Sequence, residues 1–235
     1  MAGLLTHRVG LAGGAAPTPF TLSAFQVGVS TGTNASVYNY TATGLPGDPA
    51  QVIVVFAFAQ TAATSSTVTN ITGDSGAITG TSICRNTTAQ QRVIGCSFLV
   101  GVTGTSSLIE VTFGHTMTNC VIGHMVITGT TQTTYSSRSG AGTFEPAGSV
   151  TTVTSTLPIT IPTGGVGIAF CAVYNLEDQI WTQDGGGSPS EDADQSPGAA
   201  FKGTVCHSFS TAATEFTCSS TNNGRRAIGA FSWAP

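Results

Sequence analysis

Charge is what this sequence has least of. Only 8% of its 235 residues are charged, against about 25% in an ordinary globular protein. Lys202 is the single lysine, the arginines are scattered, and the net charge is −4. The chain therefore offers no basic stripe for a phosphate backbone, and we expect no nucleic-acid partner.

Long hydrophobic runs and helical periodicity are missing as well. The longest unbroken apolar run is VIVVFAFA at Val52–Ala59. It falls far short of the roughly 20 residues that a membrane-spanning helix needs, so it indicates a buried strand and we expect no membrane partner. No segment repeats its apolar residues at a convincing helical period.

Catalytic motifs are also absent. The sequence contains no phosphate-binding loop, no H-E-x-x-H and no close carboxylate pair on a strand predicted to face a pocket. The sequence GDSG at Gly73–Gly76 is typical of the nucleophile loop of trypsin-like serine proteases, in which a histidine and an aspartate precede the serine. Here only His7 precedes Ser75. We expect neither enzymatic activity nor a cofactor.

Threonine, serine, glycine and β-branched residues are abundant, in short alternating runs separated by turn sequences such as LPGDP, TGDSG and PTGG. This pattern predicts an all-β protein, an antiparallel β-sandwich of the jelly-roll type. We expect an extended N-terminal arm over residues 1–19 that docks on a neighbour, and a single β-sandwich domain over residues 20–235. The runs at Val52–Ala59 and Val166–Val173 are apolar on both faces and should lie at its centre.

The chain also resembles itself. LPGDPAQVIVVFAFA at Leu45–Ala59 is similar to IPTGGVGIAFCAV at Ile161–Val173. A strand that begins with Gly-Thr and ends with Cys follows each, GTSIC ending at Cys84 and GTVC ending at Cys206. These similarities predict an internal duplication. Since each copy has too few strands to cover its own apolar face, we expect the copies to be related halves of one sandwich.

In both copies the next cysteine comes twelve positions later, at Cys96 and Cys218. Cys84 and Cys96 flank the polar segment RNTTAQQR, and Cys206 and Cys218 flank STAAT. We therefore predict that each pair faces across a hairpin, at a Cα separation of about 4.5–5.5 Å that permits a disulfide. Oxidation depends on the compartment, and in a reducing cytoplasm we expect adjacent thiols.

The segment GHTMTNCVIGHM contains His115, Cys120 and His124. Its pattern predicts a strand, a turn at TMTN and a second strand. Cys120 and His124 would share one face of the second strand, roughly 13 Å apart at about 3.3 Å per residue, which one zinc ion cannot bridge. We expect no metal site here, and a core or interface role for both residues. Cys120 and Cys171 should be small core residues.

Glu177–Gly198 holds six of the eleven acidic residues. Its carboxylates offer oxygen ligands for calcium, although the spacing differs from an EF-hand loop and a solvated loop is the alternative. Trp181, with Tyr174 and Trp233, would form an aromatic platform for a sugar unless these rings pack in the core. The candidate sugar-binding or surface-contact loop comprises Trp181, Asp184, Glu191, Asp192 and Asp194.

Three stretches carry a resemblance to known proteins: GTSSLIEVTFGHTMTNCVIGHMVITG, TLPITIPTGGVGIAF with WTQD following, and the terminal AIGAFSW. They are similar to a loosely defined family of bacteriophage virion proteins, across about half of the chain. The resemblance implies a β-sandwich or jelly-roll module on the outside of a phage particle, as a capsid decoration protein or a tail-fibre subunit. It implies no catalytic residue.

We therefore expect a non-enzymatic structural protein of the virion, assembled in the host cytoplasm. Its partners would be other virion proteins, further copies of the chain and a host-surface glycan. The alternative is a secreted carbohydrate-binding or adhesin module, which would use the same composition and the Trp181 loop. Such a module would also use the four N-x-[ST] sequons at Asn34, Asn39, Asn70 and Asn86.

Overall fold

A computed structural model gives the fold of the chain. It describes residues 20–61, 66–85, 92–139, 143–144, 150–155, 158–173, 177–184, 188–198, 201–210, 213–224 and 226–235. The described residues form β-strands and one short 3₁₀ helix, Asp74–Gly76, and the strand pairs between them are antiparallel. The predicted all-β, antiparallel, sandwich-like fold is confirmed. The N-terminal arm, residues 1–19, lies outside the described residues.

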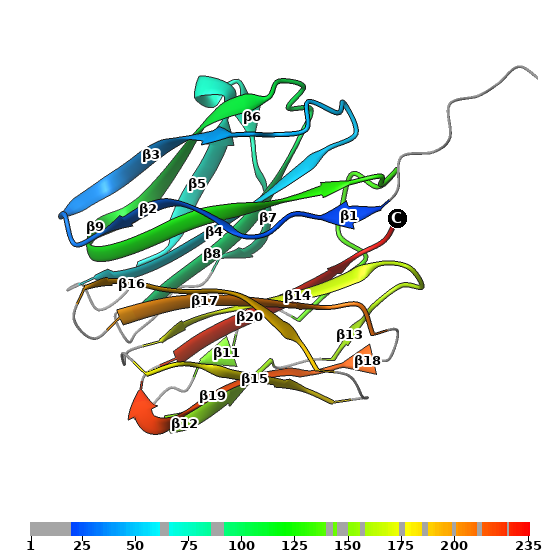
Figure 1. Cartoon of the computed structure of the whole chain (residues 1–235). Helices are drawn as coiled ribbons and strands as arrows, with labels where there is room; N and C mark the ends of the chain where they lie inside the picture. Colours follow the sequence, from blue (N-terminus) through cyan, green and yellow to red (C-terminus); the bar gives the residue numbers. More distant parts are fainter. Residues whose placement is uncertain are drawn as a thin grey trace, which may run out of the picture.

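The N-terminal half is one sheet that curls into two layers (Figure 1). The strand β9 belongs to both layers, because its first part pairs with β3 and β5 and its second part with β2 and β4. The inner layer has the order β7-β8-β4-β9-β2, and the outer layer the order β3-β9-β5-β6. The strands are β1 (Thr21–Leu22), β2 (Gln26–Thr31), β3 (Ala35–Thr43), β4 (Val52–Thr61), β5 (Val68–Gly73), β6 (Ile78–Thr79), β7 (Thr81–Arg85), β8 (Arg92–Val100) and β9 (Ser106–Thr128).

The C-terminal half also has two layers. Its inner layer has the order β16-β17-β14-β20, with β10 and β11 beyond β20, and its outer layer the order β12-β19-β15. The short strands β13 and β18 pair separately. The strands are β10 (Ser137–Arg138), β11 (Thr143–Phe144), β12 (Val150–Thr154), β13 (Ile159–Thr160), β14 (Val166–Val173), β15 (Ile180–Gln183), β16 (Ser190–Gly198), β17 (Phe201–Ser208), β18 (Ala213–Thr214), β19 (Phe216–Gly224) and β20 (Arg226–Trp233).

The two halves repeat one strand order. In the first half β1, β2 and β3 run antiparallel along the length of β9, and in the second half β10, β11 and β12 run along β20 and β19. Strands β4, β5, β7 and β8 correspond in chain order to β14, β15, β16 and β17. The repeated order supports the predicted internal duplication.

The strand register repeats too. Phe56 on β4 lies opposite Gly123 on β9, and Phe170 on β14 lies opposite Gly229 on β20. Both glycines make room for an aromatic ring. A Cβ atom at Gly123 would lie 2.2 Å from the Cζ atom of Phe25, and one at Gly229 would lie 2.5 Å from the Cζ atom of Phe170. A glycine facing the central phenylalanine is therefore a shared feature of the two halves.

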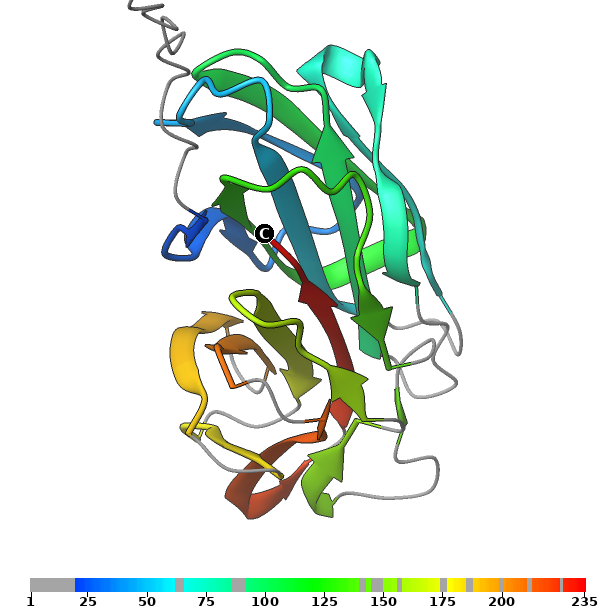
Figure 2. The same cartoon turned by 90° about the vertical axis from the view of Figure 1, so that its right-hand side faces the viewer.

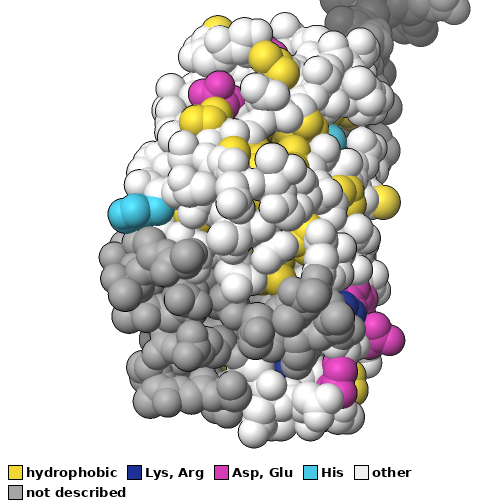
Figure 3. All heavy atoms as spheres, turned by 90° about the vertical axis from the view of Figure 1, so that its left-hand side faces the viewer, with side chains coloured by type: hydrophobic (Ala, Val, Ile, Leu, Met, Phe, Trp, Pro, Cys, Tyr) yellow, Lys and Arg dark blue, Asp and Glu magenta, His cyan; other side chains and the backbone are white. Residues whose placement is uncertain are grey.

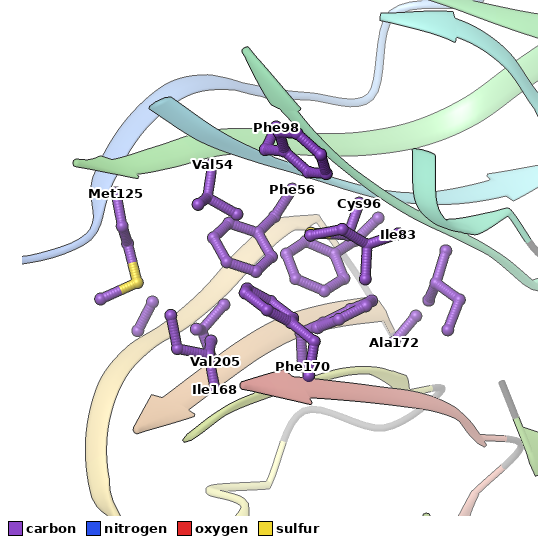
Figure 4. Packing of buried hydrophobic residues seen from close by; sticks show 14 of the residues in the cluster. Val54, Phe56, Ile83, Cys96, Phe98, Met125, Ile168, Phe170, Ala172 and Val205 are labelled. Atoms are coloured by element: carbon purple, nitrogen blue, oxygen red, sulfur yellow. The ribbon is translucent and has the colours of Figure 1, made fainter. Parts of the chain in front are cut away.

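A central hydrophobic core lies between the two inner layers (Figures 2 and 4). Alternate residues of β4 and the equivalent residues of β14 enter it from opposite sides. Because equivalent faces meet, the halves pack against each other as the two subunits of a symmetric dimer do. The residues are Val52, Val54, Phe56 and Phe58 from β4, and Val166, Ile168, Phe170 and Ala172 from β14.

The other faces of β4 and β14 fill a separate core in each half. Both strands are consequently buried on both faces, as the sequence predicted. The two copies do face each other across the central core, as related halves of one sandwich should. The reason given for that expectation is wrong, because each half also covers its own second face, with β3, β5 and β9 or with β12, β15 and β19. A single domain over residues 20–235 remains a prediction.

The predicted turn at TMTN does not form. Residues 106–128 make one strand, in which Cys120 pairs with Ala59 and lies buried while His115 is exposed. The polar stretch around His115 is the corner where β9 passes from the outer to the inner layer, and its exposure gives it the composition of a turn. His115 and Cys120 therefore lie on one continuous strand, with no hairpin between them.

Candidate assembly surfaces

The predicted acidic loop is largely an edge strand, β16, fastened to its neighbour β17 by ion pairs. Asp192 bonds the Nδ1 atom of His207 at 2.8 Å, and the Nζ atom of Lys202 donates to Asp194 at 2.6 Å. Lys202 also bonds Asp178 at 3.2 Å, whose side chain is fully exposed. These carboxylates hold the edge of the C-terminal inner layer in place.

The charged groups of this edge influence one another. Burial raises the pKa of Asp194, although its bond with Lys202 acts in the opposite direction. Burial and the neighbouring Asp194 raise the pKa of Glu191. Burial alone would lower the pKa of Lys202, but the bonds to Asp194 and Asp178 outweigh it and raise that pKa. Asp184 lies exposed at the end of β15, apart from these ion pairs.

The aromatic platform predicted for a sugar is not present. Trp181 is 8% exposed and donates its Nε1 hydrogen to the Oγ1 atom of Thr204 at 2.9 Å. Trp233 is fully buried and bonds Thr130 in the same way, at 3.1 Å. Side chains alternate along β15, which turns Trp181 into the core and its neighbour Ile180 outward. Tyr174 lies outside the described residues. Within the described ranges no three His, Cys, Asp or Glu side chains are arranged to hold a metal ion.

One of the two predicted cysteine hairpins is confirmed. Cys84 on β7 lies directly opposite Cys96 on β8. The second is wrong, because Cys206 on β17 belongs to the inner layer and Cys218 on β19 to the outer layer of the same half. The similarity of GTSIC to GTVC therefore aligned β7 with β17, whereas β17 corresponds to β8.

Cys206 and Cys218 instead meet Cys171 in the C-terminal core. All three are buried thiols in the structure, and the thiol of Cys218 donates to the Oε1 atom of Gln179 at 3.6 Å. Burial raises the pKa of Cys206 and of Cys218 well above the usual thiol value. Cys171, like Cys120 in the other half, is a core residue as predicted.

Arg226 is a buried residue that no sequence pattern indicated. It is 2% exposed, and its guanidinium donates to the Oε1 atom of Gln179 at 2.5 Å, to the Sγ atom of Cys218 at 3.6 Å and to the hydroxyl of Ser220. These bonds offset the cost of burying a charge. Arg226 begins β20 and ties it to β19 at the end of the C-terminal sandwich.

A second buried polar group lies in the N-terminal half. His124 is 2% exposed, and its Nδ1 atom lies 3.2 Å from the hydroxyl of Tyr40. The other ring nitrogen, Nε2, is buried without a hydrogen-bond partner among the described residues. Burial lowers the pKa of His124 to about 4 and raises that of Tyr40. The sequence prediction of a core role for His124 is confirmed.

One sheet edge lacks the usual protection against pairing with another chain. From Phe20 to Gly44, which spans β1 to β3, there is no charged residue, no histidine and no proline. Charges and prolines are the common means by which proteins protect exposed edges. By contrast, the edge strand β16 carries three carboxylates and Pro197. The sequence from β10 to β12, the segment of the C-terminal half that corresponds to β1–β3, contains Arg138, Glu145 and Pro146.

On the face that Figure 3 shows, most of the described surface is neither charged nor apolar. Hydrophobic side chains are scattered over it, and several acidic side chains gather over the C-terminal half. Two exposed apolar residues lie on or beside β3: Val37 is 45% exposed, and Leu108, on the neighbouring β9, is 37% exposed. The large exposed hydrophobic residues of the described chain are Val27, Val37, Leu108, Ile180 and Phe209.

Comparisons with protein-family models, curated proteins and solved structures gave no match. Among the described residues no helix is long and apolar enough to cross a membrane. The resemblance to phage virion proteins therefore rests on the sequence stretches alone, and the function of the chain is inferred below from its surfaces.

Proposed function

We propose that the chain is a structural protein on the exterior of a bacteriophage particle, either a capsid decoration protein or a tail-fibre subunit. It has no catalytic role and no cofactor in this proposal. Its partners are other virion proteins and further copies of the chain, with a host-surface glycan as a third candidate. It assembles in the host cytoplasm and is localised to the virion.

The unprotected edge of the N-terminal half is the observation that carries this proposal. A soluble monomer that left nine residues of β3 without charge or proline at a sheet edge would risk aggregation. A subunit of an assembly has a use for such an edge. The low charge of the whole chain supports the same role, because few ionic groups need to be desolvated when its surfaces are covered.

The experiment is to lyse host cells that carry the gene for the chain and to purify particles from the lysate on density gradients. Mass spectrometry then measures the amount of the chain relative to the major shell protein. We expect the chain to co-sediment with the particles through a second gradient, at a reproducible copy number. Absence from the particles, with the chain found instead in the particle-free medium, would contradict the proposal.

A secreted carbohydrate-binding module is the alternative class. Burial of Trp181 and Trp233 removes the aromatic platform that favoured it. The intact mass of the native protein separates the two classes. A virion protein keeps Met1 or Ala2 at its N-terminus and starts with reduced thiols. A secreted module loses its leader and oxidises cysteines, first of all the opposed Cys84 and Cys96.

A further inference from the structure

We propose that β3 pairs antiparallel with β3 of a second copy of the chain, about a two-fold axis at Asn39. The outer layers of the two N-terminal halves would then join into one continuous sheet. The surface is the free edge of β3 and the partner is a second copy of the same chain. The pairing rests on this edge and requires an Asn39 without a glycan, as in a protein assembled in the cytoplasm.

The backbone of β3 has a free side. Among the described strands, β3 pairs with β9 alone. In a strand that is paired on one side, the N–H and C=O groups of alternate residues point to the other side and lack a partner in the sheet. Over the nine residues of β3, this leaves a row of donors and acceptors that another strand can satisfy.

The sequence of β3 is nearly self-complementary. It contains VYNYT, from Val37 to Thr41. Antiparallel pairing centred on Asn39 sets Tyr38 opposite Tyr40 of the partner subunit, and Val37 opposite its Thr41. Aromatic pairs and pairs of β-branched residues are favourable cross-strand neighbours. In this register odd-numbered residues lie opposite odd-numbered residues, and even-numbered opposite even-numbered. The backbone N–H and C=O groups that point away from β9 therefore meet each other in the dimer, whichever of the two sets they belong to.

The same register covers exposed apolar surface. Val37, Asn39 and Thr41 are exposed on one face of β3, while Tyr38 is turned into the core. Thr41 lies opposite Leu108 on β9. Val37 of the partner subunit would therefore lie beside Thr41 and one strand from Leu108. Two exposed hydrophobic residues of each chain, Val37 and Leu108, become partly covered, which favours association.

The equivalent strand of the C-terminal half is the internal comparison. β12 has the same place in its outer layer as β3 and is also an edge strand. It has five residues against nine, and Glu145 and Pro146 precede it in the sequence. β3 therefore lacks the charge and the proline that stand in sequence beside the related edge strand β12, so nothing of that kind opposes pairing at β3.

Cysteine cross-linking tests the register. In the Asn39→Cys variant the two introduced thiols would face each other across the axis, within disulfide distance. Oxidised glutathione supplies the oxidant: two protein thiols form one disulfide and glutathione disulfide is reduced to two thiols. The matched control is Thr43→Cys, on the same exposed face of β3. Its two copies would lie about 26 Å apart, eight residues at about 3.3 Å each.

We expect most of the Asn39→Cys protein to become a disulfide-linked dimer on a non-reducing gel. Thr43→Cys and the wild-type chain should stay largely uncross-linked. In the wild-type chain Cys96, Cys120, Cys171, Cys206 and Cys218 are buried, and the sixth cysteine, Cys84, has its partner for oxidation within the same chain, at the opposed Cys96. Equal cross-linking of both variants would mean random collision and would overturn the register. No cross-linking of Asn39→Cys would overturn the pairing.

Association itself is tested by sedimentation velocity of Val37→Lys over a range of concentrations. The dimer places two ammonium groups between the paired β3 strands, where a small uncharged side chain now lies and where the nearest opposite charge is Glu110 on the neighbouring β9. We therefore expect the dissociation constant to rise by about tenfold or more. Thr152→Lys, an exposed position on β12, should leave it unchanged. Thr41→Lys repeats the test on the opposed residue. If both β3 variants dimerise like the wild-type chain, or if that chain is monomeric at every concentration, the proposal is wrong.

Discussion

Phe56 and Phe170 occupy equivalent positions in the two halves, and their rings meet edge to face with centroids 5.5 Å apart. Each ring lies at the middle of a strand that is buried on both faces. This contact joins the inner layers across the central core, so the folding of one half depends on the other.

Replacing Phe56 or Phe170 by alanine should lower the free energy of unfolding by about 3–5 kcal/mol, the usual cost of a phenylalanine-sized cavity. Chemical denaturation followed by fluorescence measures it. Because the halves share this core, each variant should still unfold in one transition. Phe209→Ala is the control, since Phe209 is 55% exposed and its loss should cost less than about 1 kcal/mol. Two separate transitions would contradict the shared core.

Gly229→Ala should destabilise the protein by about 1–3 kcal/mol, because the added Cβ atom meets the ring of Phe170. The second change Phe170→Leu removes that clash, so Gly229→Ala should cost less in its presence. A double-mutant cycle measures this coupling. For Gly114→Ala, where the nearest atom is 3.7 Å away, we expect no comparable loss. Additive effects of the Gly229 and Phe170 substitutions would show that the clash is not the cause.

The buried His124 makes stability depend on pH. Its pKa is about 4 in the folded protein and about 6.5 when unfolded, so the unfolded state binds the extra proton first. Above pH 6.5 the histidine is neutral in both states and costs no stability. As the pH falls from 6.5 toward 4, the free energy of unfolding should decrease by up to about 3 kcal/mol. Urea denaturation of wild-type and His124→Gln proteins at several pH values isolates this effect. An identical pH profile for both proteins would exclude it.

Deleting residues 1–19 should prevent incorporation into particles while leaving the fold intact, because an extended arm that docks on a neighbour gains binding energy from its buried apolar area. Circular dichroism checks the fold, and co-sedimentation with particles measures incorporation. Dimerisation through β3 should persist in the truncated chain. If the truncated chain enters particles as efficiently as the full chain, the arm has no role in assembly.

Local patterns in the sequence predicted the all-β class and the two central strands, because burial on both faces leaves a continuous apolar run at Val52–Ala59 and Val166–Val173. The LPGDP and IPTGG turns with the strands after them located the equivalent parts of the duplication correctly. The equal spacing of the two cysteine pairs did not locate equivalent parts, because spacing does not show whether the second cysteine lies in the same sheet as the first. Cys206 and Cys218 flank a connection between layers.

Two features of the surfaces needed the structure. Trp181 follows exposed Ile180 on an edge strand. Only the structure shows which face of this strand is buried, and hence that the indole of Trp181 points inward. The exposed corner of β9 at His115 has the composition of a turn, although the strand continues through it. The lack of charge from Phe20 to Gly44 is visible in the sequence, but its position at a sheet edge depends on the pairing of β3 with β9 alone.

Amide hydrogen exchange of the full-length protein, compared between concentrated and dilute samples, tests self-association through β3 most directly. At high concentration the amides of residues 35–43 that point away from β9 should be protected, and on dilution they should exchange fast. The amides of β16, at the charged edge, should exchange alike in both samples. Fast exchange of those β3 amides at every concentration would contradict the account.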